Sequence, residues 1–222
     1  MRKLIRSNID AYSKIVDRTG LSTLAVAVSS YAPMDIITTL IEANPVSASL
    51  VDQYGASPLH IACLNGTNLE TFRLITEHDK EGTAGVPDNN NYTVLHHAVE
   101  HVCILIEGRY FGEDQCMGGS EHTIESEHQD YLEIIKDLCE RYPRTVHIAT
   151  FDNGDTPLDI PQIMMMKRPC KKNNHYHKRL EEVYRILKEA SIRIYRAQKH
   201  HWENSTEKGY KTSSDTGREL PI

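Results

Sequence analysis

Apolar residues recur along this chain with the spacing of one helix face, in short segments separated by polar turns. The spacing predicts helices over residues 34–42, 69–77 and 130–140. Because a residue that precedes proline avoids the helical region, Asn44-Pro45 and Tyr142-Pro143 are expected to end the first and third of them. A longer apolar stripe predicts one further helix from about His177 to His201. Its members are Leu180, Val183, Leu187, Ala190 and Ile194.

A short motif stands before these helices and recurs along the chain. Ser57-Pro58-Leu59-His60 returns 36 residues later as Thr93-Val94-Leu95-His96 and stands 35 residues earlier as Ser22-Thr23-Leu24-Ala25. Thr156-Pro157-Leu158-Asp159 is a fourth and weaker copy. A fixed period in the thirties is typical of a solenoid and not of a closed catalytic domain.

The order of residues in the motif predicts a tight turn followed by a capped helix. A residue that tolerates positive φ stands two positions before each hydroxyl, and these residues are Gly20, Gly55, Asn91 and Gly154. The hydroxyl residues expected to cap the helices are Ser22, Ser57, Thr93 and Thr156. The leucine two positions after each hydroxyl is then the buried anchor of its helix.

The motif resembles the ankyrin repeat. The resemblance implies an all-α ankyrin-repeat solenoid of stacked helix-turn-helix units, with hairpin-like turn tips and a long C-terminal helix. It implies a structural role for His60 and His96, which would bond back toward the hydroxyl residue and the neighbouring turn. It also implies a non-catalytic scaffold that binds another protein through the turn tips and the concave helix face.

Carried over position by position, the resemblance assigns partner-binding residues to each repeat. In the second and third repeats they are Gln53, Tyr54, Ala56, Leu64, Asn65, Asn89, Asn90, Tyr92, Glu100 and His101. In the first repeat they are Arg18, Thr19, Leu21, Ser29 and Ser30. Tyr54 and Tyr92 are expected to stack as neighbours on this strip, and exposed aromatic residues are frequent binding hot spots.

The repeats divide the chain into six segments. These are a partial N-terminal repeat (1–16), three repeats (17–51, 52–87 and 88–151), a degenerate repeat with a basic capping helix (152–202) and a disordered tail (203–222). The chain is thus expected to begin mid-repeat, either as a fragment or with an atypical first unit. In the degenerate repeat Asp159 replaces the histidine, and Pro161 is expected to cut the first helix short.

The third repeat holds an acidic insertion at about 104–129. The insertion is expected to lengthen both helices around a disordered tip near 112–122. Its acidic residues are Glu107, Glu113, Asp114, Glu121, Glu125 and Glu127. A tolerated surface insertion is favoured over a binding loop, since lengthening a loop costs little conformational entropy.

Charge is distributed unevenly along the chain. Residues 167–201 hold eleven Lys/Arg and three Asp/Glu, a local charge of +8. Because the whole chain has a net charge of −6, the rest of it carries −14. Binding of nucleic acid or an anionic surface by 167–201 is therefore the alternative function, although a solvated capping helix is favoured. The N-terminus has no apolar leader, and the five cysteines lack paired spacing. We expect reduced thiols and a cytoplasmic protein, with the nucleus as the alternative.

Motifs for catalysis or for a cofactor are missing from the sequence. No nucleotide-binding glycine loop, nucleophile elbow or kinase motif occurs, so neither an enzyme nor a cofactor is expected. Two histidine groups invite a metal hypothesis: His97 and His101 near Cys103, and His175 and His177 near Cys170. Neither has the spacing of a structural zinc site, so no metal is expected.

Overall fold

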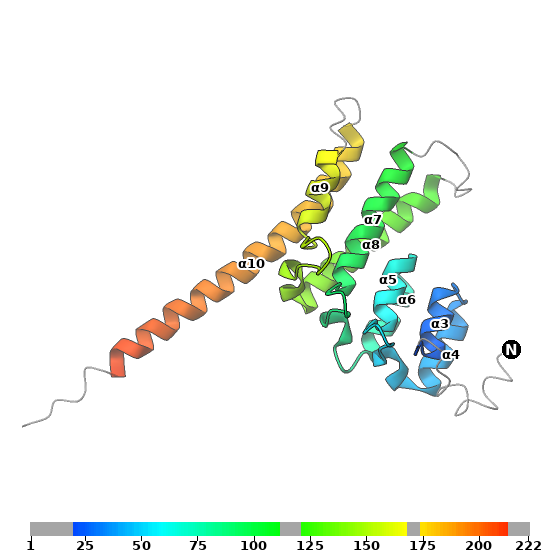
Figure 1. The fold of residues 1–222 in the computed structure, drawn as a ribbon, viewed down its shortest axis with the longest axis horizontal. Helices are drawn as coiled ribbons and strands as arrows, with labels where there is room; N and C mark the ends of the chain where they lie inside the picture. Colours follow the sequence, from blue (N-terminus) through cyan, green and yellow to red (C-terminus); the bar gives the residue numbers. More distant parts are fainter. Residues whose placement is uncertain (1–19, 112–120, 168–173, 213–222) are drawn as a thin grey trace, which may run out of the picture.

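The computed structural model describes residues 20–111, 121–167 and 174–212, and within these ranges it is helical without a β-strand. Helix pairs stack side by side and a long helix crosses the end of the stack and continues beyond it (Figure 1). The expected all-α solenoid is confirmed. Four first helices follow the four copies of the motif: α3 (Thr23–Ser29), α5 (Pro58–Asn65), α7 (Val94–Phe111) and α9 (Asp159–Lys167). Three second helices follow α3, α5 and α7: α4 (Met34–Ala43), α6 (Leu69–His78) and α8 (Glu121–Arg141).

Short 3-10 turns and a long helix complete the described chain. They are η1 (Pro45–Ser49), η2 (Thr83–Gly85), η3 (Pro143–His147) and α10 (Asn174–Thr212). The first helices contact one another in the order α3, α5, α7, α9, and the second helices in the order α4, α6, α8. Two layers result, and α10 covers their end by contacting α7, α8, α9 and η3.

The turns before the first helices are left-handed, as expected. Positive φ values of 82°, 79°, 66° and 77° occur at Gly20, Gly55, Asn91 and Gly154. Successive turn tips are joined by backbone hydrogen bonds. The N–H of Asn89 donates to the carbonyl of Tyr54 at 2.9 Å, and the N–H of Phe151 donates to the carbonyl of Asn90 at 3.0 Å.

The core lies between the two helix layers and beneath α10. The leucine of the motif is fully buried in the first three helices, at Leu24, Leu59 and Leu95. Small residues at Ala62 and Ala98 are buried as well, so neighbouring helices pack closely there. The apolar stripe of α10 is buried at Leu180, Val183, Leu187 and Ala190, while Ile194 is half-buried.

Several expectations about the C-terminal part were wrong. Pro161 does not shorten α9, because it is the third residue of this nine-residue helix, in the first turn, where a backbone N–H has no partner within the helix. The hydroxyl of Thr156 does not cap a helix either. It donates to the carboxylate of Asp159 at 2.6 Å, and the N–H of Thr156 donates to the same oxygen at 2.9 Å. The charged carboxylate of Asp159 is a stronger hydrogen-bond acceptor than a hydroxyl, so the Thr156 hydroxyl acts here as a donor.

The tail expected over 203–222 is partly helical. Helix α10 continues to Thr212, well beyond His201, because an established helix gains a hydrogen bond with each residue that it adds. Residues 213–222 lie outside the described residues, as do the proposed partial repeat at 1–16 and most of the tip near 112–122. The lengthened helices on both sides of that tip are confirmed, with 18 residues in α7 and 21 in α8.

Candidate functional site

The two motif histidines are structural groups. Nδ1 of His60 accepts from the N–H of Ser57 at 3.2 Å, and the hydroxyl of Ser57 accepts from the N–H of His60 at 3.4 Å. His96 and Thr93 repeat the arrangement at 3.0 and 3.3 Å. Both imidazoles are buried. Burial lowers the pKa of His60 to about 4, assisted by the neighbouring His97, and burial lowers the pKa of His96 as well.

The turn-tip residues expected to bind a partner lie on the surface. Gln53, Asn89 and Asn90 are exposed, and Ala56 is half-buried. Asn89 links two tips, because its Nδ2 donates to the carbonyl of Gln53 at 3.1 Å. Tyr54 contributes its backbone carbonyl to the same link, while its side chain is 55% exposed. Of these five residues, Tyr54 therefore displays the largest apolar area to a partner.

Tyr92 is committed to the fold. Its ring lies parallel to that of His97 with the centroids 5.4 Å apart, and its hydroxyl donates to Asp152 at 3.0 Å. Burial and the bond to Asp152 raise the pKa of Tyr92 to about 12. The expected stacking of Tyr54 on Tyr92 is therefore wrong, since the fourth turn tip and the next helical turn hold this ring.

The partner-binding residues expected on the first helices differ in how far their side chains are exposed or already held by neighbouring residues. Leu64 is 56% exposed. Asn65 is half-buried, and its carbonyl accepts from the hydroxyl of Tyr31. Glu100 lies 3.8 Å from Nδ1 of His97. His101 stacks on Tyr131 with the centroids 4.5 Å apart, and its Nε2 lies 3.3 Å from Glu127.

The first repeat contributes less than expected among the described residues. Arg18 and Thr19 lie outside them. Leu21 and Ser29 are half-buried, and Ser29 donates to the carbonyl of Val26 at 2.9 Å. Ser30 is exposed at the end of α3.

Tyr31 is a surface residue that the sequence reasoning missed. It is 69% exposed and has a positive φ of 52°. The signal was present in the repeat itself, because Tyr31 occupies the position that Gly66 occupies 35 residues later. Comparing the helix ends as well as the helix starts of the repeats would have identified it.

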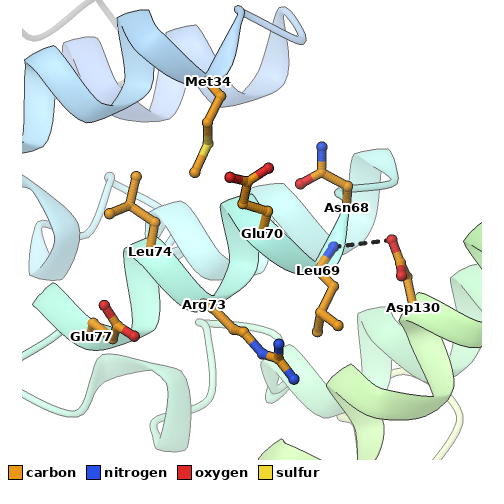
Figure 2. Close-up of a pocket in the computed structure, with 8 residues that line it drawn as sticks. All are labelled: Met34, Asn68, Leu69, Glu70, Arg73, Leu74, Glu77 and Asp130. Atoms are coloured by element: carbon orange, nitrogen blue, oxygen red, sulfur yellow. Dashed lines mark hydrogen bonds between the residues drawn. The ribbon is translucent and has the colours of Figure 1, made fainter.

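A cleft of about 610 Å³ lies on the opposite face, among the second helices (Figure 2). Met34, Leu69 and Leu74 supply its half-buried apolar part. Glu70, Glu77, Arg73 and Asn68 stand around it, and Asp130 accepts from the N–H of Leu69 at 3.2 Å (Figure 2). The residues that line this cleft include no nucleophile with an adjacent base, so it points to no particular chemistry.

Part of the basic segment and part of the acidic insertion neutralise each other. Arg179 of α10 forms an ion pair with Glu125 of α8 and a hydrogen bond with His128. Arg185 lies 3.8 Å from Glu189. Further along α10, Arg193 and Arg196 are exposed beside Tyr195. Exposed basic side chains are therefore spread along the described part of α10, from Lys178 to Arg196.

The histidines and cysteines form no recognisable metal centre within residues 20–111, 121–167 and 174–212, where no group of three or more His, Cys, Asp or Glu could hold an ion. Cys63, Cys103 and Cys139 are buried free thiols, and burial raises the pKa of each. These thiols are therefore protonated at neutral pH. None of the described helices is long and apolar enough to cross a bilayer.

Comparison with known proteins identifies one family. Residues 9–113 match the family model of ankyrin repeats, in three copies. No curated protein matches the chain. The matched range contains the first three turns and the helices from α3 to α7.

Proposed function

We propose that the whole chain is a non-catalytic scaffold that binds a protein through the first helices and turn tips of its first two repeats. Residues 9–113 are ankyrin repeats, which are generally a non-catalytic module for protein–protein interaction. One observation carries the proposal. Two large side chains of this surface, Tyr54 and Leu64, are more than half exposed. Cytoplasmic localisation with reduced thiols is part of the same proposal.

The side chains of the third repeat support this assignment to the first two. Tyr92 and His101 are held by groups from other elements, Asp152 and Tyr131. A side chain that already packs within the fold offers a partner less new contact area than one that faces solvent. We therefore place the energetic centre of the interface at Tyr54 and Leu64 and treat Tyr92 as a support.

The proposal is tested with the tagged full chain and the double variant Tyr54→Ala, Leu64→Ala. Proteins captured from a native lysate are quantified by mass spectrometry. We expect the variant to lose specific partners while its thermal transition stays within a few degrees of the wild type, since substitutions of exposed residues change stability little. Val46→Ala is the matched control, because Val46 is 62% exposed but lies in η1, after a second helix. Equal capture by the wild type, the control and the folded double variant contradicts the proposed surface.

A second function has one observation in its favour. Lys178, Arg193 and Arg196 are exposed on α10, and the outer half of that helix runs away from the repeats (Figure 1). We propose nucleic acid or an anionic surface as its ligand. Retention on heparin should then fall steeply with salt and disappear after Arg193→Gln, Arg196→Gln. Retention that is unchanged in this variant contradicts the second function.

A further inference from the structure

Tyr31 has a backbone conformation that its side chain disfavours. Its φ is 52°, in the left-handed region, and the equivalent residue of the next repeat is Gly66 with a φ of 86°. Glycine adopts this conformation without a steric clash, whereas a residue with a β-carbon does not. The turn after α3 therefore holds a residue that is less suited to the backbone than the one its neighbouring repeat uses.

The side chain of Tyr31 adds nothing to the core to offset this disadvantage. The ring is 69% exposed. Its hydroxyl donates a hydrogen bond to the carbonyl of Asn65, at the end of α5. This bond ties the ring to the end of α5, across the boundary between the first and second repeats, and Leu64, the residue before Asn65, is exposed. A fixed, exposed tyrosine provides a large contact area with little entropy left to lose on binding.

Tyr31 and Leu64 belong to a row that continues onto the next helix. Leu64 and Glu100 are equivalent residues of successive repeats, on α5 and α7, which contact each other. Ile104 lies one turn beyond Glu100 on the same face and is 64% exposed. The row therefore combines three exposed apolar side chains with a carboxylate.

Acidic residues predominate in the chain up to residue 108, just before Arg109 near the end of α7. Residues 20–108 contain ten Asp/Glu but two Lys/Arg, which are Arg73 in α6 and Lys80 just after it. Neither lies on a first helix or a turn tip, whereas Glu100 lies on α7 and Glu127, which bonds to His101, lies beside it. A surface with this charge attracts a positively charged partner and disfavours an acidic one.

We propose that Tyr31 and Leu64 anchor a partner segment that carries Lys or Arg next to apolar side chains. The inference rests on the proposed binding function and names the chemistry of the partner. The ring of Tyr31 and the side chain of Leu64 contact the apolar side chains of the partner, and the carboxylate of Glu100 pairs with its Lys or Arg. The backbone strain at Tyr31 is then retained for binding and not for folding.

The experiment uses the full chain and a phage-displayed library of random peptides as the probe. We expect the selected peptides to be enriched in Lys or Arg beside Leu, Ile, Phe, Tyr or Trp. A synthetic peptide of the consensus should bind the Tyr31→Gly variant at least about tenfold more weakly than the wild type, as expected for a hot-spot tyrosine. Glu100→Gln should weaken the same peptide and reduce the salt dependence of its binding. Val46→Ala should bind as the wild type does.

Tyr31→Gly also separates binding from folding. Glycine suits the left-handed backbone, so its thermal transition should equal or exceed that of the wild type although binding is lost. Tyr31→Asn, which tolerates positive φ, is the second variant and should behave likewise. Lower stability together with normal peptide binding would show that the tyrosine serves the fold, and would overturn the inference.

The remaining outcomes distinguish this inference from the proposed function. Peptides that are acidic or uncharged, or that bind Tyr31→Gly normally but fail on Tyr54→Ala, overturn the inference and leave the binding function standing. A library without any enriched sequence counts against both. Self-association that disappears in Tyr31→Gly would identify the basic α10 of a second copy as the occupant, and would overturn the assignment to a separate partner.

Discussion

Lowering the pH from 7 to 4.5 should destabilise this protein through the buried imidazole of His60. The ring is almost fully buried, and its Nδ1 accepts the hydrogen bond from the N–H of Ser57. The neutral ring must then carry its proton on Nε2, which has no partner among the described residues. A second proton would remove the Nδ1 acceptor and place a charge inside the protein. Protonation of this ring therefore destabilises the folded protein.

The size of the effect follows from the two pKa values of the same ring. The pKa of His60 is lowered from 6.5 to about 4, mainly by burial and then by His97, while Asp88, the backbone of Tyr92 and Asp79 act in the opposite direction. Between these values the unfolded chain binds the proton and the folded chain does not. The contribution of His60 to the free energy of unfolding is therefore fully present above pH 6.5 and is lost as the pH falls toward 4. The separation corresponds to roughly 3 kcal/mol, a large part of the stability of an ordinary domain.

Urea unfolding followed by far-UV circular dichroism at a series of pH values measures this loss. His60→Gln cannot gain the proton, so its stability should fall about 2–3 kcal/mol less than that of the wild type between pH 7 and pH 4.5. Ile61→Val is the matched control: it is destabilised by about 0.5–1.5 kcal/mol but keeps the imidazole and so the full pH dependence. Parallel losses in the wild type and His60→Gln would refute the reasoning, because carboxylate protonation would then explain the whole effect.

Two further predictions concern the fold around the second repeat. Gly66→Ala should cost more stability than Gly154→Ala in urea unfolding. Both residues have positive φ, so both substitutions strain the backbone. A β-carbon at Gly66 would also lie 2.7 Å from the imidazole of His101, whereas one at Gly154 would meet no atom within 4 Å. Equal losses would show that backbone strain alone matters. Tyr131→Phe should cost about 1–3 kcal/mol, because the lost hydroxyl accepts from the buried N–H of Thr67 at 2.9 Å and donates to a carbonyl of α5. An unchanged urea midpoint in this variant would contradict the buried bond.

The helices and turns could be predicted from the sequence because their causes are local. A glycine or asparagine before a hydroxyl residue determines a left-handed turn and a cap within a few residues, as at Gly55 and Ser57. Proline then marks the ends of α4 and α8. The roles of His60 and His96 followed from the resemblance, and both pair with a hydroxyl residue three positions away in the chain.

The availability of the predicted binding residues could not be predicted, because it depends on partners that are distant in sequence. Tyr92 bonds to Asp152, 60 residues away, and His101 bonds to Glu127 from the far side of the insertion. Nothing in the pattern around Tyr92 indicates that the fourth turn would reach it. Asp159 is the opposite case, since the sequence marked it as a defect although its carboxylate accepts the two bonds from Thr156.

The insertion and α10 together restrict where a partner can bind. Glu127 holds His101, and Glu125 pairs with Arg179 of α10, so these two charges of the insertion are used within the molecule. The first two repeats hold the exposed Tyr31, Tyr54 and Leu64. A partner gains most by burying apolar area that the fold has left in solvent. We therefore expect a partner to bind at the end of the stack far from α10, where Tyr31, Tyr54 and Leu64 are exposed.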